Sequence, residues 1–356
     1  MKTYVILSFL IFSAGCKKDL AEPKNLAAIA KLRLGWLSVE NWGEPVQSAL
    51  YSGDLFKELP EGKGKVEVIY GKKWAYYRGS FSQGIPHGYG EYQYSSGRYY
   101  QGSIQNNQFD GKGRMEYSIG DDQYTYQGEF FHGEPNGKGM LAIKYQNGKK
   151  LVYQGTFERG QKHGKGSLEI RNAKQGLLYT FDGEFKNGLK AGFGKEVIFT
   201  NSGKEVYEGE FAEDQRNGKG SLKKLGKSGK NFSYEGQFLN NRQHGYSEFH
   251  ENPGKSGPEL RYNGEFKDGQ RHGQGTLHTK FPNGDEVKYV GGFANNKENG
   301  NSKVVSEDSA GGKKVFEGRY VDGKANGPGI LTNIRDGGNK ETSAGFFKDG
   351  KLSESH

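Results

Sequence analysis

Hydrophobic and polar residues alternate along most of this chain, and glycines interrupt the alternation at fixed places. The clearest stretch, YRGSFSQGIPHGYGEY, begins at Tyr77 and returns in the same register from Tyr126, Tyr153 and Tyr262. With the first residue numbered 0, aromatic residues occupy positions 0, 4 and 15 of the Tyr77 copy, and glycines occupy positions 2, 7, 11 and 13. Alternation with a period of two is typical of β-strands, so each copy is predicted to form a β-hairpin.

The phrase recurs throughout residues 51–350. Copies begin at Tyr51, Tyr77, Tyr100, Tyr126, Tyr153, Phe181, Tyr207, Tyr234, Tyr262, Tyr289 and Phe316, with a broken twelfth copy at Ser343. A fixed period of this length indicates a repeat architecture in which each unit buries surface against its neighbours. We therefore predict an all-β fold: an elongated, single-layer antiparallel meander of about 11–12 stacked β-hairpins.

Positions 6 and 7 are predicted to form a two-residue turn, because pairs such as Asn187-Gly188 and Asp268-Gly269 favour the left-handed backbone of hairpin turns. Further turns are expected between hairpins, at Ser96-Gly97, Asn147-Gly148, Ser202-Gly203 and Asn283-Gly284. If 6 and 7 form the turn, positions whose numbers sum to 13 face each other. Glycine 2 should then face glycine 11, and the aromatic at 0 should cover the cross-strand glycine at 13.

The other face of each hairpin is predicted to be polar and exposed to solvent. On that face we expect three cross-strand pairs: Glu208 with Lys219, Gln127 with Lys138, and Gln154 with Lys165. Composition supports a thin sheet, because 58 of 356 residues are glycine and only 32% are hydrophobic. The net charge of +9 comes from interleaved lysines and glutamates, so we expect no nucleic-acid partner.

The N-terminus differs from the rest of the chain. Residues 1–15 are predicted to be a signal peptide, with an apolar run over residues 4–12 that is too short to span a membrane. Ser13, Ala14 and Gly15 precede Cys16, the only cysteine, and this segment resembles a bacterial lipoprotein signal. The resemblance implies that Cys16 becomes the mature N-terminus and carries acyl chains such as palmitate. Secretory cleavage at the same small residues, leaving a free thiol, is the competing interpretation.

Residues 16–25 would then be a lipidated, flexible tether. Lys17 follows the cysteine, and by the same resemblance this favours an outer-membrane or surface location in the cell envelope. Residues 26–50 are interpreted as an N-terminal cap that contains Trp36 and Trp42, and residues 351–356 as a tail.

Two copies carry a family resemblance most clearly: YQGEFFHGEPNGKGML from Tyr126 and YNGEFKDGQRHGQGTL from Tyr262. They resemble the MORN repeat (membrane occupation and recognition nexus). The resemblance implies single-layer sheets of stacked hairpins that serve in scaffolding, self-association and tethering at membranes. Phospholipid binding has also been proposed for the family.

Candidate chemistry is sparse within the array. Histidines occupy position 10 in four copies, but equivalent positions in adjacent hairpins would lie roughly 9.6 Å apart, too far to share a zinc ion. We interpret them as structural residues that flank the turn; they are His87, His163, His244 and His272. The sequence predicts no catalytic residue, no metal site and no cofactor.

The leading hypothesis is a non-enzymatic, lipid-anchored protein of the cell envelope whose repeat array is a protein-interaction scaffold. Its expected partners are the membrane, through Cys16, and an envelope protein, with self-association as a further hypothesis. The alternative is a module that binds envelope glycan through exposed aromatic residues or anionic lipid through lysines at the hairpin tips. A secreted enzyme of unknown chemistry is the distant alternative.

Overall fold

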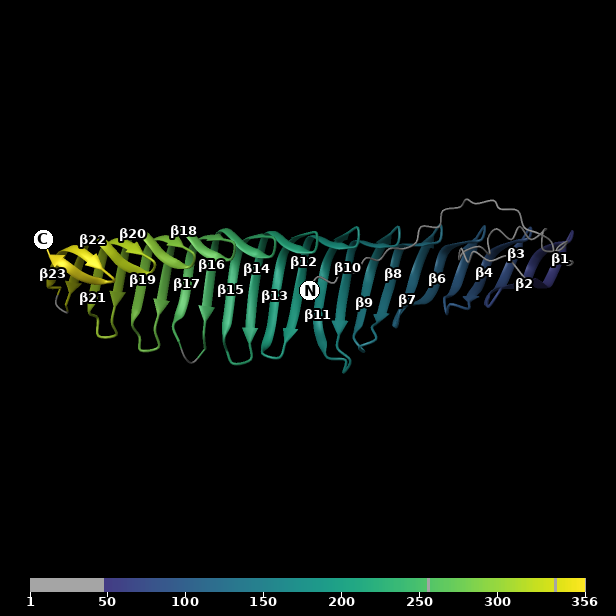
Figure 1. Ribbon diagram of the computed structural model, residues 1–356, viewed down its shortest axis with the longest axis horizontal. Helices are drawn as coiled ribbons and strands as arrows, with labels where there is room; N and C mark the ends of the chain where they lie inside the picture. Colours follow the sequence, from purple (N-terminus) through teal and green to yellow (C-terminus); the bar gives the residue numbers. More distant parts are fainter. Residues whose placement is uncertain (1–47, 255–256, 336–337, 356) are drawn as a thin grey trace. The chain divides into compact units, whose positions relative to one another are not determined.

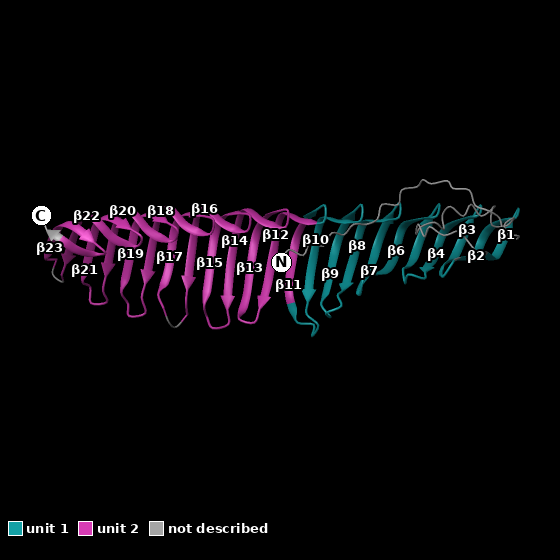
Figure 2. Cartoon of the chain, in the orientation of Figure 1, with its two compact units in different colours: residues 1–177, 185–188 teal, residues 178–184, 189–356 magenta. Residues whose placement is uncertain are grey.

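The computed structural model describes residues 48–254, 257–335 and 338–355. These residues form an all-β structure of 24 strands in an antiparallel sheet, which confirms the predicted fold class (Figure 1). The predicted signal peptide, Cys16, the tether and most of the predicted cap lie outside the described residues. The chain divides into unit 1, residues 1–177 and 185–188, and unit 2, residues 178–184 and 189–356 (Figure 2).

In unit 1, each strand from β1 to β9 pairs with the next strand in the sequence. These strands are β1 (Ser48–Phe56), β2 (Leu59–Tyr70), β3 (Lys73–Ser82), β4 (Ile85–Tyr94), β5 (Tyr99–Gln105), β6 (Gln108–Ile119), β7 (Asp122–Phe131), β8 (Glu134–Lys144), β9 (Lys150–Glu158) and β10 (Gln161–Arg171). β11 (Leu177–Lys186) contributes residues to both units.

In unit 2, the strands from β12 onward pair in the same consecutive order. They are β12 (Leu189–Thr200), β13 (Gly203–Ala212), β14 (Gln215–Gly226), β15 (Asn231–Leu239), β16 (Arg242–Asn252), β17 (Glu259–Lys267), β18 (Gln270–Lys280), β19 (Glu286–Ala294), β20 (Lys297–Glu307), β21 (Lys313–Val321), β22 (Lys324–Ile334), β23 (Lys340–Lys348) and β24 (Lys351–Ser355).

The hairpin turns lie at positions 6 and 7, as predicted. Gln83 and Gly84 have φ angles of 50° and 79°, and Asn106 and Asn107 have 48° and 64°. Two successive residues with positive φ match the right-handed twist of the flanking strands. Three of the four connecting turns are also confirmed. The fourth is displaced by one residue, because Asn201 and Ser202 form the turn and Gly203 begins β13.

The predicted register of the hairpins is wrong beyond the turn. Next to the turn, Phe81 pairs with Pro86, so positions 4 and 9 face each other as expected. Beyond it, Gly79 pairs with Gly90, so glycine 2 faces glycine 13 rather than glycine 11. The shift arises because Gly88, at position 11, takes a φ of 90° and forms a bulge in β4. The aromatic at position 0 consequently faces position 15, as Tyr77 faces Tyr92.

The same shift overturns the three predicted polar pairs. Glu208 pairs with Ser221 within its hairpin, Gln127 with Met140, and Gln154 with Ser167. Glu208 instead meets a lysine of the preceding strand, at 3.5 Å from Lys195 Nζ. The polar face therefore exists as predicted, but its cross-strand partners differ.

The core is a row of aromatic rings that cover pairs of glycines. Tyr77 is fully buried, and a Cβ atom on Gly79 or Gly90 would come within 2.7 Å of its Cζ. The ring at position 4 packs edge-to-face against the position-0 rings of its own hairpin and of the preceding one. Phe157, for example, lies 5.1 Å from Tyr153 and 5.0 Å from Tyr126 between ring centroids. Each hairpin thus depends on its neighbour for burial.

Candidate functional site

The histidines at position 10 are spread over separate hairpins, as the sequence predicts. His163 lies 3.2 Å from Glu158, and His244 has a buried Nδ1 that makes no hydrogen bond within the described part of the chain. Among the described residues, no three His, Cys, Asp or Glu side chains are grouped to hold a metal ion. In that part of the chain, no helix is long and apolar enough to cross a membrane.

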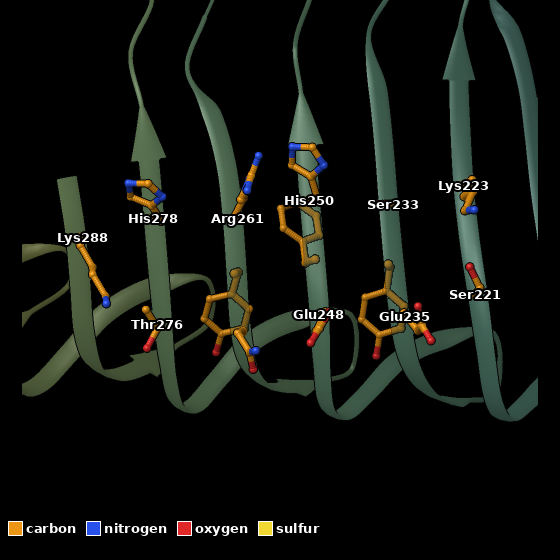
Figure 3. Close-up of a pocket in the computed structure, with 14 residues that line it drawn as sticks. Ser221, Lys223, Ser233, Glu235, Glu248, His250, Arg261, Thr276, His278 and Lys288 are labelled. Atoms are coloured by element: carbon orange, nitrogen blue, oxygen red, sulfur yellow. The ribbon is translucent and has the colours of Figure 1, made fainter. Parts of the chain in front are cut away.

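A continuous row of mostly basic side chains crosses the polar face of unit 2. The residues pair one to the next on strands β14 to β19: Lys223, Ser233, His250, Arg261, His278 and Lys288. We call these six residues the basic row. Figure 3 shows His250, Arg261 and His278 on neighbouring strands at one level of the sheet. Valines end the row on both sides, because Lys223 pairs with Val206 and Lys288 with Val305.

Carboxylates hold the middle of the basic row in place. Glu259 Oε1 lies 2.7 Å from His250 Nε2 and 2.8 Å from Arg261 Nη2. Hydrogen bonds from Arg261 and His250 lower the pKa of Glu259. Glu286 contacts His278 at 3.0 Å and Lys280 at 2.9 Å, and hydrogen bonds from Lys280 and His278 lower its pKa. The two carboxylates therefore remain ionised and orient the side chains of His250, Arg261 and His278.

The ends of the basic row are different. Lys223 and Lys288 are exposed, and within the described residues neither forms an ion pair. A second row lies two residues further along the strands on the same face: Ser221, Glu235, Glu248, Asn263, Thr276 and Val290. In it Glu235 pairs directly with Glu248. Residues of both rows, with the strand backbone between them, line an open depression of ≈ 770 Å³ (Figure 3).

Unit 1 provides an internal comparison, because the same positions form a row there too. None of those residues is basic, and three are acidic: Glu67, Tyr76, Gln93, Tyr99, Glu116, Thr125, Ala142, Val152 and Glu169. These positions do not build the repeat, since their side chains lie on the polar face. The basic row is therefore a local feature of β14–β19 rather than a property of the repeat.

A second departure from the repeat is a buried ionic cluster in unit 2. Glu196 occupies position 15, where other hairpins carry an apolar residue, and its side chain is 7% exposed. It contacts Lys190 Nζ at 2.6 Å and Arg216 Nη2 at 2.7 Å, and Tyr179 donates a 2.7 Å hydrogen bond to it. Arg216 also reaches Glu205 at 2.7 Å. All the carboxylates and cations of this cluster are partnered, which gives it a structural role.

The sequence analysis predicted a polar, solvent-exposed face, but it did not identify the basic row or Glu196. A position-by-position comparison of the hairpin sequences would have identified them. Such a comparison isolates the basic residues that flank positions 0 and 15, and it isolates Glu196 as the charged residue at position 15. Cys16, the predicted lipidation site, lies outside the described residues.

Comparison with known families adds an independent finding. The family model described as MORN repeat matches nine segments, namely residues 77–97, 100–122, 126–142, 153–172, 181–200, 207–224, 234–246, 262–286 and 316–333. Each segment begins at a position-0 aromatic and extends into the second strand of its hairpin. A comparison with curated proteins gave no match.

Proposed function

We propose that this chain, which is a MORN-repeat protein, is a lipid-anchored scaffold of the cell envelope that binds a protein partner through the polar face of its sheet and catalyses no reaction. One observation carries the proposal. The position-0 rings of the repeat are buried within the sheet, whereas the polar face carries a pattern of charge that differs from one part of the array to another. Tyr77, Tyr153 and Tyr207 are fully buried on the aromatic face.

The burial of these rings weighs against glycan stacking on the aromatic face. Stacking on a sugar requires an exposed aromatic face, and the position-0 rings already lie over glycines and against neighbouring rings. Contacts with anionic lipid through lysines at the tips are the other alternative. They predict saturable binding to anionic vesicles, which the scaffold role does not require.

The anchor is proposed at Cys16, from the small residues that precede it. Two acyl chains hold a protein at a membrane stably, whereas one chain does so only marginally. Metabolic labelling with a fatty acid is expected to mark the wild-type chain and not the Cys16→Ala variant. If the variant incorporates the label equally, the lipoprotein interpretation is wrong.

The scaffold role is tested in cells that express the full chain. Photo-crosslinking from a residue analogue at Ser233, the second residue of the basic row, is expected to give a defined adduct with one envelope protein. The matched control carries the analogue at Thr125, which holds the equivalent position on β7. Adducts of equal yield from both positions, or none from either, would contradict a scaffold that binds its partner at this face.

A further inference from the structure

We infer that the basic row is the docking site for an acidic polypeptide segment of a partner protein, which lies across strands β14 to β19. The inference rests on the proposed scaffold role and names the chemistry of the partner. The six strands span five intervals of roughly 4.8 Å, so the row is about 24 Å long. An extended segment of about seven residues covers that length.

The unpaired charges define what the site recognises. Lys223 and Lys288 stand exposed at the two ends without an ion pair in the described chain. Between them, the Arg261 side chain is 67% exposed although it also contacts Glu259. Arginine presents several donors in a planar fork, so Arg261 can bind a second carboxylate beside the first. The row therefore offers three places for carboxylates along one line.

The two glutamates of the second row favour a polypeptide, rather than a uniformly negative polymer, as the ligand. Glu235 and Glu248 face each other directly, and neither forms an ion pair within the described residues. Like charges placed opposite each other on a sheet destabilise it, and a cation supplied by a partner relieves the repulsion. A polyphosphate chain would meet these two carboxylates with more negative charge. A polypeptide can place acidic residues over the basic row and a lysine or arginine over the glutamate pair.

The direct test measures binding of labelled peptides to the purified full chain by fluorescence anisotropy. The probes are an octapeptide of alternating glutamate and threonine and an octapeptide of alternating lysine and threonine. We expect saturable binding of the acidic probe, weakened by added salt, and no saturable binding of the basic probe. Equal binding of both probes would overturn the proposal.

A matched pair of variants locates the site. The variant Lys223→Gln/Arg261→Gln/Lys288→Gln removes three positive charges from the basic row, and we expect the acidic probe to bind it at least about tenfold more weakly. The variant Lys112→Gln/Lys138→Gln/Lys165→Gln removes three exposed positive charges from the polar face of unit 1 and should bind within about twofold of wild type. An equal loss in both variants would mean that net charge, not the row, governs binding.

Removal of the two glutamate charges is expected to have the opposite effect on binding of the acidic probe. The variant Glu235→Gln/Glu248→Gln is expected to bind the acidic probe more tightly than wild type, because two repelling charges are gone. Inorganic polyphosphate and vesicles containing an anionic phospholipid serve as competitors. If either displaces the peptide from the basic row more effectively than unlabelled peptide does, the ligand class is phosphate and the proposal fails.

The crosslinking experiment separates this inference from the proposed function. If the analogue at Ser233 captures an envelope protein from wild type, and the triple variant of the basic row captures it equally well, the scaffold role stands and the acidic-segment inference fails. If wild type captures nothing in the envelope while the purified chain binds the acidic probe, the docking chemistry stands and the envelope scaffold role fails. The melting temperature of each variant shows whether a loss reflects unfolding.

Discussion

Arg216 donates a 2.7 Å hydrogen bond from Nη2 to the carboxylate of Glu196, and the two side chains are 10% and 7% exposed. The pair lies on the face that holds the aromatic rings and most of the other buried apolar side chains. Arg216 also lies over the ring of Tyr207, with its Cζ 4.9 Å from the ring centroid. Buried charges are costly unless they are fully partnered, so this pair makes the surrounding hairpins depend on one another.

Replacement of Glu196 by leucine restores the apolar residue that other hairpins carry at position 15. We nevertheless expect Glu196→Leu to lower the free energy of unfolding by about 3 kcal/mol, because Lys190 loses its carboxylate and Arg216 keeps only Glu205. Urea denaturation and hydrogen exchange of β12–β14 measure the effect. The control is Glu196→Leu/Lys190→Met/Arg216→Met, which removes the stranded cations and should recover most of the loss. A single variant as stable as wild type would contradict this account.

The same cluster predicts a stability loss in acid. Burial alone raises the pKa of Glu196, but Lys190, Tyr179 and Arg216 together lower it below its ordinary value of 4.5. A carboxyl whose folded pKa is depressed contributes stability above its unfolded pKa and loses it as the pH falls through the folded value. The urea midpoint of the wild type should therefore fall more steeply below pH 4.5 than that of Glu196→Gln. Parallel profiles below that pH would count against the contribution of Glu196.

The tyrosine hydroxyls at position 0 predict a loss of stability in alkali. Burial raises the pKa of Tyr207 to about 12, and its hydroxyl donates a 3.0 Å hydrogen bond to the Glu210 carbonyl. Because the folded pKa exceeds the ordinary value of 10.0, the contribution is present below pH 10 and is lost as the pH rises toward 12. Tyr207→Phe should cost about 1 kcal/mol at neutral pH and show a smaller alkaline loss.

Two hairpins of the chain show that phenylalanine fits this position. Phe181 and Phe316 are buried over the equivalent pair of glycines in their own hairpins, although phenylalanine has no hydroxyl group. A Tyr207→Phe variant that loses several kcal/mol at neutral pH would therefore point to a packing role for the hydroxyl. Absorbance titration of the tyrosines checks that the alkaline step follows phenol ionisation.

The sequence predicted the hairpins and their turns because both depend on local chemistry: alternation of side chains, and Asn, Asp or Gly where φ is positive. It did not predict the register, because a bulge changes which residues face each other without changing the spacing of the glycines. The two classes of glycine do differ in the sequence. Position 11 needs positive φ and is glycine in every complete copy, whereas position 13 is only crowded by a ring and becomes Ser247 and Ser302 in two copies.

The alternation of side chains predicted the face on which the candidate site lies, but not the residues that form it. The line formed by Lys223, Arg261 and Lys288 could not be predicted, because it depends on the true register of the strands, and the predicted register is wrong by two residues. The ionic cluster likewise joins Lys190, Glu196 and Arg216 across neighbouring hairpins. Lipidation of Cys16 stays a prediction, because it depends on the N-terminal segment alone.

The packing of rings on glycines can be tested by a double-mutant cycle between Gly90 and Tyr77. The three heavy atoms nearest to a Cβ on Gly90 would all belong to the Tyr77 side chain, with Cζ at 2.7 Å. Since Gly90 does not have a positive φ, its backbone accepts alanine, and the Tyr77 side chain is the nearest obstacle to the substitution. Gly90→Ala should therefore cost about 2–3 kcal/mol in wild type through overpacking, and close to nothing in the Tyr77→Ala background. Both costs come from urea denaturation, and equal costs in the two backgrounds would show that the ring is not what requires glycine there.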